Sequence, residues 1–149
     1  MPSARQPAGC SLLPGEMQDS GERGLPRLVL VDGNNVMGSR PDGWWRDRRQ
    51  AMQRLVDEVA AHTARAGGEW TIVFDGRPRS LTAPPGASLS IVYSERRGKN
   101  AADDRIVKLA ADSTPHRSVL VYTSDRDLRA RVTMFGANVE GAGTLRRKL

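Results

Sequence analysis

The apolar segment at residues 28–31 constrains the fold more than any other part of this chain. Its sequence is Leu-Val-Leu-Val, and it ends abruptly at Asp32-Gly33-Asn34-Asn35. Because successive residues of a strand point to opposite faces, an unbroken apolar run is typical of a strand that is buried on both faces. Such strands belong to parallel sheets that helices cover. We therefore expect an α/β fold whose first strand stops at Asp32.

Apolar segments typical of strands recur along the chain. We expect further strands at 70–74, 89–93, 119–122 and near 138–140, and helices at 45–66, 103–111 and 126–135. The first of these helices ends at Gly67-Gly68, a natural C-cap. Alternating strands and helices of this length predict a doubly wound, Rossmann-like domain in three α/β/α layers with a mainly parallel central sheet.

Residues 1–26 differ from the rest, because they are rich in Pro, Gly, Ser and charge. We expect them to form a disordered tail, followed by one domain over residues 27–149. Cys10 is the only cysteine, which excludes an intramolecular disulfide and a cysteine zinc site and favours the cytoplasm. No apolar run is long enough to span a bilayer, and the N-terminus lacks a signal core, so no membrane partner is expected.

The formal charge is +6 and the pI is near 10.4. A basic surface attracts phosphates without sequence specificity, so this charge raises the expectation of RNA or DNA as a partner. Charge that only keeps the protein soluble is the open alternative.

Aspartates end three of the expected strands. They are Asp32, Asp75 and Asp125, all at the sheet edge where open α/β folds bind ligands. Each of them alone is also explained by the preference of Asp for turns and N-caps. Asp103 precedes Val107 by four residues and so projects from the buried face of its helix. The position of Asp104 is equally well explained by the favourable interaction of an acidic side chain with the helix dipole in the first turn.

Carboxylates crowded at one edge repel one another unless a cation lies among them. Sites rich in oxygen select hard ions such as Mg²⁺ or Mn²⁺. Such ions activate water and neutralise charge on a phosphodiester, so the reaction needs no catalytic histidine. His62 and His116 are expected to be peripheral.

Four segments then carry a resemblance to a known family. They are Leu-Val-Leu-Val-Asp-Gly-Asn-Asn-Val-Met at 28–37, Ile-Val-Phe-Asp-Gly at 72–76, Asp-Asp-Arg-Ile-Val-Lys-Leu-Ala at 103–110 and Thr-Ser-Asp-Arg-Asp-Leu at 123–128. Together they resemble the NYN domain of the PIN-like nuclease superfamily over about residues 27–145, and within it the bacterial YacP-like ribonucleases. The third segment is also similar to the metal-binding helix of CCCH zinc-finger ribonucleases.

The resemblance implies a PIN-like fold and endonucleolytic hydrolysis of RNA with Mg²⁺ or Mn²⁺. It implies that the catalytic, metal-binding set is Asp32, Asp103, Asp104 and Asp125, with Asp127 as an outer-sphere ligand. Asn35 matches an asparagine that orients a carboxylate or contacts a phosphate. YacP-like proteins often have Glu-Thr-Ala-Asp at the helix entry, whereas this chain has Asn-Ala-Ala-Asp at 100–103.

Basic and polar residues nearby are candidates for substrate contacts. Arg96, Arg97 and Lys99 precede Asp103 and either hold phosphates or are solvated surface charge. Ser124 is a further candidate. The alternative for Asp127 is a structural role, because Ser124 and Asp127 have the spacing of a helix capping box. We expect Trp44 and Trp45 to pack on a helix rather than stack on a base, and the basic residues 146–148 to be a solvated end.

Three classes of function remain in comparison. The leading one is a metal-dependent endoribonuclease. The second is an RNA-binding or ribosome-associated module with little catalysis. The third, a nucleotide-binding domain, is disfavoured because no G-x-G-x-x-G or G-x-x-x-x-G-K motif follows the first strand. A homodimer and a toxin role stay open.

Overall fold

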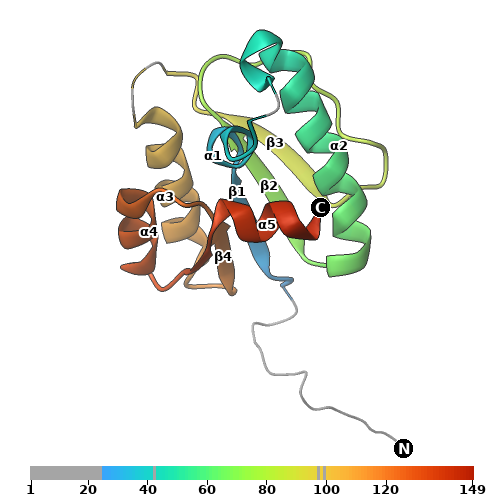
Figure 1. Cartoon of the computed structure of the whole chain (residues 1–149). Helices are drawn as coiled ribbons and strands as arrows, with labels where there is room; N and C mark the ends of the chain where they lie inside the picture. Colours follow the sequence, from blue (N-terminus) through green and yellow to red (C-terminus); the bar gives the residue numbers. More distant parts are fainter. Residues whose placement is uncertain (1–24, 42, 97, 99) are drawn as a thin grey trace, which may run out of the picture.

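The computed structural model describes residues 25–41, 43–96, 98 and 100–149 (Figure 1). In chain order the elements are β1 (Leu28–Asp32), α1 (Gly33–Gly38), the 3-10 helix η2 (Trp44–Arg46), α2 (Arg48–Ala66), β2 (Glu69–Phe74), β3 (Leu89–Tyr93), α3 (Ala101–Ser113), β4 (Val119–Tyr122), α4 (Arg126–Thr133), β5 (Asn138–Glu140) and α5 (Ala142–Lys148). The expected tail lies almost entirely outside the described residues.

The five strands form one sheet in the order β3-β2-β1-β4-β5. Every neighbouring pair is parallel, which confirms the predicted parallel α/β fold. β1 is central, and the strand order runs outward from it in both directions. In doubly wound sheets such a switch point leaves a crevice at the carboxyl ends of the strands, where ligands bind. Asp32, the last residue of β1, stands at this point.

Helices cover both faces of the sheet. In Figure 1, α3 and α4 lie on one side, and α1, α2 and α5 lie on the other. Alternate residues of β1 supply the two cores, because Val29 and Val31 pack in the cluster with α2 whereas Leu28 and Leu30 pack in the cluster with α3 and α4. This double burial is what the apolar run at 28–31 predicted.

The expected strands at 89–93, 119–122 and 138–140 match β3, β4 and β5, and the expected strand at 70–74 is one residue shorter than β2. The expected helix at 45–66 is divided, since η2 comes first and Asp47 then caps α2 by accepting a hydrogen bond from the backbone N of Gln50 at 3.0 Å. Trp44 packs against the core as expected. Trp45 is 55% exposed and does not.

Two helices were not expected from the sequence. α1 begins at Gly33 and packs so close to β2 that a Cβ there would lie 2.5 Å from Cε1 of Phe74. α5 contains the basic residues 146–148, for which a solvated end was expected. That expectation is wrong for Arg146, whose Nη1 donates to Oε1 of Glu58 at 2.9 Å and whose Nη2 donates to the carbonyl of Val36 at 3.2 Å.

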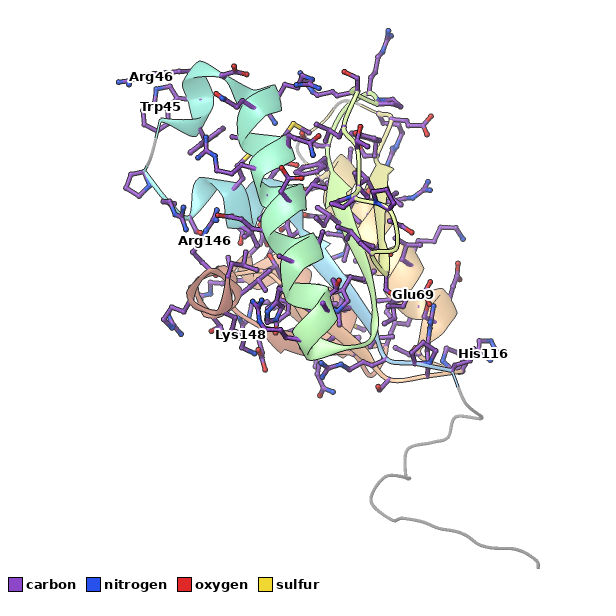
Figure 2. The ribbon with its side chains drawn as sticks, turned by 90° about the vertical axis from the view of Figure 1, so that its right-hand side faces the viewer. Trp45, Arg46, Glu69, His116, Arg146 and Lys148 are labelled. Atoms are coloured by element: carbon purple, nitrogen blue, oxygen red, sulfur yellow. The ribbon has the colours of Figure 1, made fainter. Side chains whose placement is uncertain are left out.

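Figure 2 shows Arg146 beside α2, and it also shows Trp45 and Arg46 at one end of the molecule and Glu69 and His116 at the other. Within the residues that the structure describes, no helix is long and apolar enough to cross a membrane.

Candidate active site

Three of the predicted aspartates come together at the carboxyl edge of the sheet. Asp32 ends β1, Asp125 follows β4 directly before α4, and Asp103 lies in the first turn of α3. β1 and β4 are neighbours, and α3 runs on the same face as α4. The parallel topology therefore delivers three carboxylates from distant parts of the chain to the switch point.

Asp32 is the most deeply buried of these carboxyl groups, with 4% of the residue exposed. Its pKa is raised from 3.8 to about 6, chiefly by burial and also by the charges of Asp103 and Asp125. Two hydrogen bonds oppose the rise. The Thr123 hydroxyl donates to Oδ2 at 2.8 Å, and the backbone N of Asn35 is the second donor. Asp32 is thus oriented by the protein but is not neutralised by it.

Asp103 is only partly exposed. Burial raises the pKa of its carboxyl group, as do the charge of Asp125 and, more weakly, those of Asp104 and Asp127, while the Arg131 guanidinium opposes the rise. Asp125 therefore acts on both Asp32 and Asp103. These three carboxylates form one repelling group, which is the arrangement that a cation would relieve.

Asp104 lies on the exposed side of the same helix turn. Nη2 of Arg131 donates to its Oδ1 at 2.9 Å, and Nη2 of Arg96 donates to its Oδ2 at 3.2 Å. These bonds, that of Arg131 first, lower the pKa of the Asp104 carboxyl group. Its charge is already balanced by arginines, unlike the charge of Asp32.

The loops that carry the aspartates are bound to each other through Asn35. Its Oδ1 accepts a hydrogen bond from the backbone N of Ser124 at 2.7 Å. Thr123, which is fully buried, donates to Asp32 and accepts from the backbone N of Asp125 at 3.1 Å. A role for Thr123 was not predicted from the sequence. The available signal was a hydroxyl residue placed directly between an apolar strand and an aspartate loop.

The start of α4 differs from the predicted capping box. Asp125, not Ser124, is the N-cap residue, and its Oδ1 accepts from the backbone N of Leu128 at 2.9 Å. The Ser124 Oγ instead accepts from the backbone N of Ala142 at 2.9 Å, at the start of α5. Asp127 stays exposed in the first turn of α4. The capping box fails because the chain enters the helix one residue later than the spacing suggested.

Comparison with known proteins identifies the family. The sequence model of the YacP-like NYN domain matches residues 29–149. The chain belongs to this family. Two solved structures are similar to this NYN domain, the W164L mutant of Rae1 (YacP) from Bacillus subtilis and the unmutated Rae1. Both are 25% identical to it in sequence.

The mutant structure has a TM-score of 0.67, and the match covers 82% of this chain and 74% of that one. The unmutated Rae1 has a TM-score of 0.66, with coverages of 81% and 72%. No curated protein matches the sequence. The predicted family and its fold are thereby confirmed. Since NYN domains are PIN-like nuclease domains, membership supports a nuclease function in general, with RNA as the substrate.

The remaining residues that were predicted from the sequence come from different segments of this NYN domain. Asp75, at the end of β2, lies 3.3 Å from Nη2 of Arg48, and its backbone N donates to Oδ1 of Asn34 at 2.8 Å. Arg96 is bound to Asp104, as described above. The predicted contacts Arg97 and Lys99 lie outside the described residues. His116 is at the opposite end of the molecule from η2 (Figure 2).

The donor chemistry of the NYN site suits a hard cation, because carboxylate oxygens are what Mg²⁺ and Mn²⁺ prefer and these carboxylates repel one another. The carboxylates nevertheless lie farther apart than the ligands of a single bound metal ion. Over residues 25–41, 43–96, 98 and 100–149, no three His, Cys, Asp or Glu side chains lie close enough together to hold a metal ion.

Proposed function

We propose that this NYN domain is a metal-dependent endoribonuclease that hydrolyses RNA phosphodiester bonds with Mg²⁺ or Mn²⁺. The observation that carries the proposal is the state of Asp32. It is buried at the switch point, its pKa is raised to about 6, and Asp103 and Asp125 raise it rather than lower it. Membership of a PIN-like nuclease family supports the same conclusion.

Asp32, Asp103 and Asp125 would hold the cation. When bound, the cation supplies activation of water and neutralisation of the charge that develops on the phosphodiester. Asp127 would act as an outer-sphere ligand. Asp104 would join the inner set only by exchanging its bonds to Arg96 and Arg131. Carboxylates supply the negative charge that the cation needs, so neither histidine has a part in this mechanism.

The residues around the carboxylates position them. Thr123 holds one oxygen of Asp32 and at the same time the backbone of Asp125. Asn35 binds the loop before α4 to α1. Ser124 ties the same loop to the start of α5. This network keeps the carboxylates in place although they repel one another.

Cleavage of labelled single-stranded RNA tests the proposal. We expect cleavage with Mg²⁺ or Mn²⁺, and loss of cleavage with EDTA or in the Asp32→Asn variant. The control is Asp112→Asn, because Asp112 lies at the far end of α3 in a surface pair with Lys108 and its side chain is 65% exposed. Binding of Mn²⁺ measured by calorimetry should be lost in Asp32→Asn and kept in the control. Equal cleavage by Asp32→Asn and the wild type would disprove the mechanism.

The wide spacing of the carboxylates in the described chain favours a second candidate, an RNA-binding module with little catalysis. RNA binding without cleavage, across varied RNAs and with either metal, would establish this alternative. Contact with the ribosome and formation of a homodimer stay predictions.

A further inference from the structure

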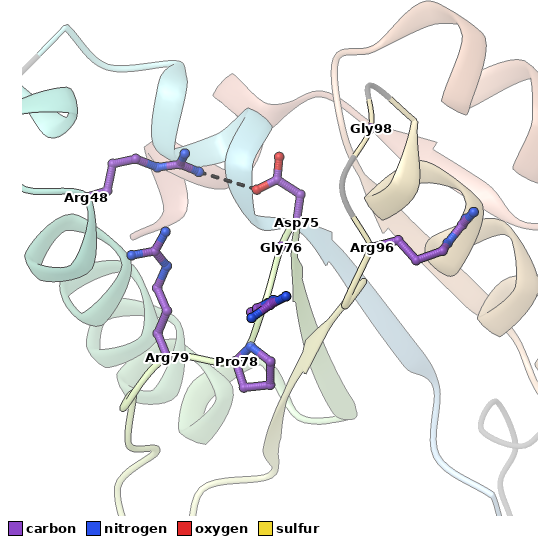
Figure 3. Close-up of a pocket in the computed structure, with 8 residues that line it drawn as sticks. Arg48, Asp75, Gly76, Pro78, Arg79, Arg96 and Gly98 are labelled. Carbon is purple, nitrogen blue, oxygen red and sulfur yellow. Dashed lines mark hydrogen bonds and ion pairs between the residues drawn. The ribbon is translucent and has the colours of Figure 1, made fainter.

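A pocket of about 500 Å³ opens next to the aspartate edge, at the carboxyl end of β2. Its lining comes from three places: Arg48 at the start of α2, the segment 75–79 after β2, and Arg96 with Gly98 after β3 (Figure 3). The volume lies within the range of pockets that bind small ligands, roughly 300–1,000 Å³.

The charge of this pocket suits an anion. Its lining contains four arginines, Arg48, Arg77, Arg79 and Arg96, and one acidic residue, Asp75. Arg48 pairs with Asp75 at 3.3 Å, and Figure 3 shows this contact with the side chain of Arg79 directed toward the same space. Within the described residues, no acidic side chain pairs with Arg77 or Arg79.

The chemistry of these groups narrows the anion further. A guanidinium group presents several donors in a planar fork that matches the oxygens of a phosphate. Arg48 is already engaged by Asp75, whereas Arg77 and Arg79 are exposed. These two guanidinium groups are the donors that a phosphate would engage.

The pocket adjoins the proposed catalytic edge. Asp32 pairs in register with Val73, two residues before Asp75, on strands about 4.8 Å apart. The side chain of Asn34, two residues after Asp32, accepts from the backbone N of Asp75. At the other rim, Arg96 is bound to Asp104 of α3. An RNA strand lying across the aspartates would therefore extend over the pocket.

We propose that this arginine pocket binds a phosphate group of the RNA strand next to the one that is cleaved. The proposal rests on the ribonuclease function proposed above and adds a second point at which the substrate is held. Holding a strand at two points fixes where it crosses the aspartates, which sets the position of the scissile bond. Phosphate contacts carry no base information, so the pocket contributes affinity and register, not sequence preference.

Binding of fluorescein-labelled single-stranded RNA in EDTA tests the pocket without any cleavage. The test variant is Arg77→Gln with Arg79→Gln. Both residues are exposed and lie in the loop after β2, so the variant is expected to fold. The control is Arg65→Gln, which removes one positive charge from the last turn of α2, about 25 Å along the helix from Arg48.

We expect the double variant to bind RNA about tenfold more weakly than the wild type. We also expect its slope of log affinity against log salt to fall by about 1.4, from two lost contacts at about 0.7 each. The control should change the affinity for RNA by no more than about twofold and should leave the slope against log salt unchanged. RNAs with a 5′-phosphate and a 5′-hydroxyl distinguish the source of the phosphate. An equal loss for both identifies an internal diester, and a loss confined to the phosphorylated RNA identifies a terminal monoester.

Two negative results separate the two proposals. A double variant that binds RNA as tightly as the control overturns the pocket and leaves the ribonuclease proposal standing. A wild-type protein that neither binds nor cleaves RNA overturns both. Cleavage mapping gives an independent check, since we expect the double variant to cut at more positions than the wild type, and an unchanged cleavage pattern would contradict the role in register.

Discussion

Replacing Asp32 by Asn should make the protein more stable while it removes activity. Asp32 is only 4% exposed, and its pKa is raised from 3.8 to about 6, mainly by burial. Holding this carboxylate in its charged form costs folding about 3 kcal/mol, at 1.36 kcal/mol for each pKa unit. An asparagine side chain has no charge to bury. Its Oδ1 still accepts the hydrogen bond from Thr123.

The effect should depend on pH in a defined direction. Below about pH 3.8 the carboxyl group is protonated in both the folded and the unfolded chain, so it costs nothing. Between about pH 3.8 and 6 the unfolded chain loses its proton first, so the stability of the wild type falls as the pH rises. Above about pH 6 the cost is complete. The variant should escape this fall.

Urea unfolding in EDTA at pH 4 and at pH 7.5 measures the effect. We expect Asp32→Asn to raise the free energy of unfolding by about 2–3 kcal/mol at pH 7.5 and by less than about 0.5 kcal/mol at pH 4. Added Mg²⁺ should stabilise the wild type and leave the variant unchanged, because only the wild type binds the ion. Asp112→Asn, a surface change, should stay within about 0.5 kcal/mol at both pH values. A variant less stable than the wild type at pH 7.5, or an equal change at both pH values, would refute the argument.

Three further predictions concern positions outside the carboxylate set. Thr123→Val removes the hydroxyl that orients Asp32 and should lower the rate of RNA cleavage about 10- to 100-fold. Thr123→Ser keeps a hydroxyl and should retain most of the activity. Equal rates for the Val and Ser variants would show that the hydroxyl has no such role. Gly33→Ala should destabilise the fold by about 1–3 kcal/mol, measured by urea unfolding, because its Cβ would lie 2.5 Å from the ring of Phe74, and a neutral result would mean that α1 shifts freely. Arg146→Gln should cost about 1–2 kcal/mol, and the double variant with Glu58→Gln should cost less than the sum of the single variants. Strict additivity in that cycle would show that the pair does not interact.

The sequence by itself determined the strands of the sheet and where most of them begin and end. The strands β3, β4 and β5 were predicted with their observed limits. The reason is clearest for β4, a continuous apolar run that is buried on both faces and has polar neighbours at its ends. The same local logic placed Asp32 and Asp125 at strand ends. α1 escaped prediction because six residues are too few to display a helical period.

Only the tertiary structure decided which side chains meet. Thr123 becomes a partner of Asp32 because β1 and β4 are neighbours, a pairing between residues 91 positions apart that no local pattern contains. Arg146 is held by Glu58, 88 residues away, so its spacing within a basic run was misleading. The arginine pocket likewise joins the start of α2 to two loops. The sequence sets what each segment can bury, whereas contacts between distant segments depend on how strand order and helix packing bring them together.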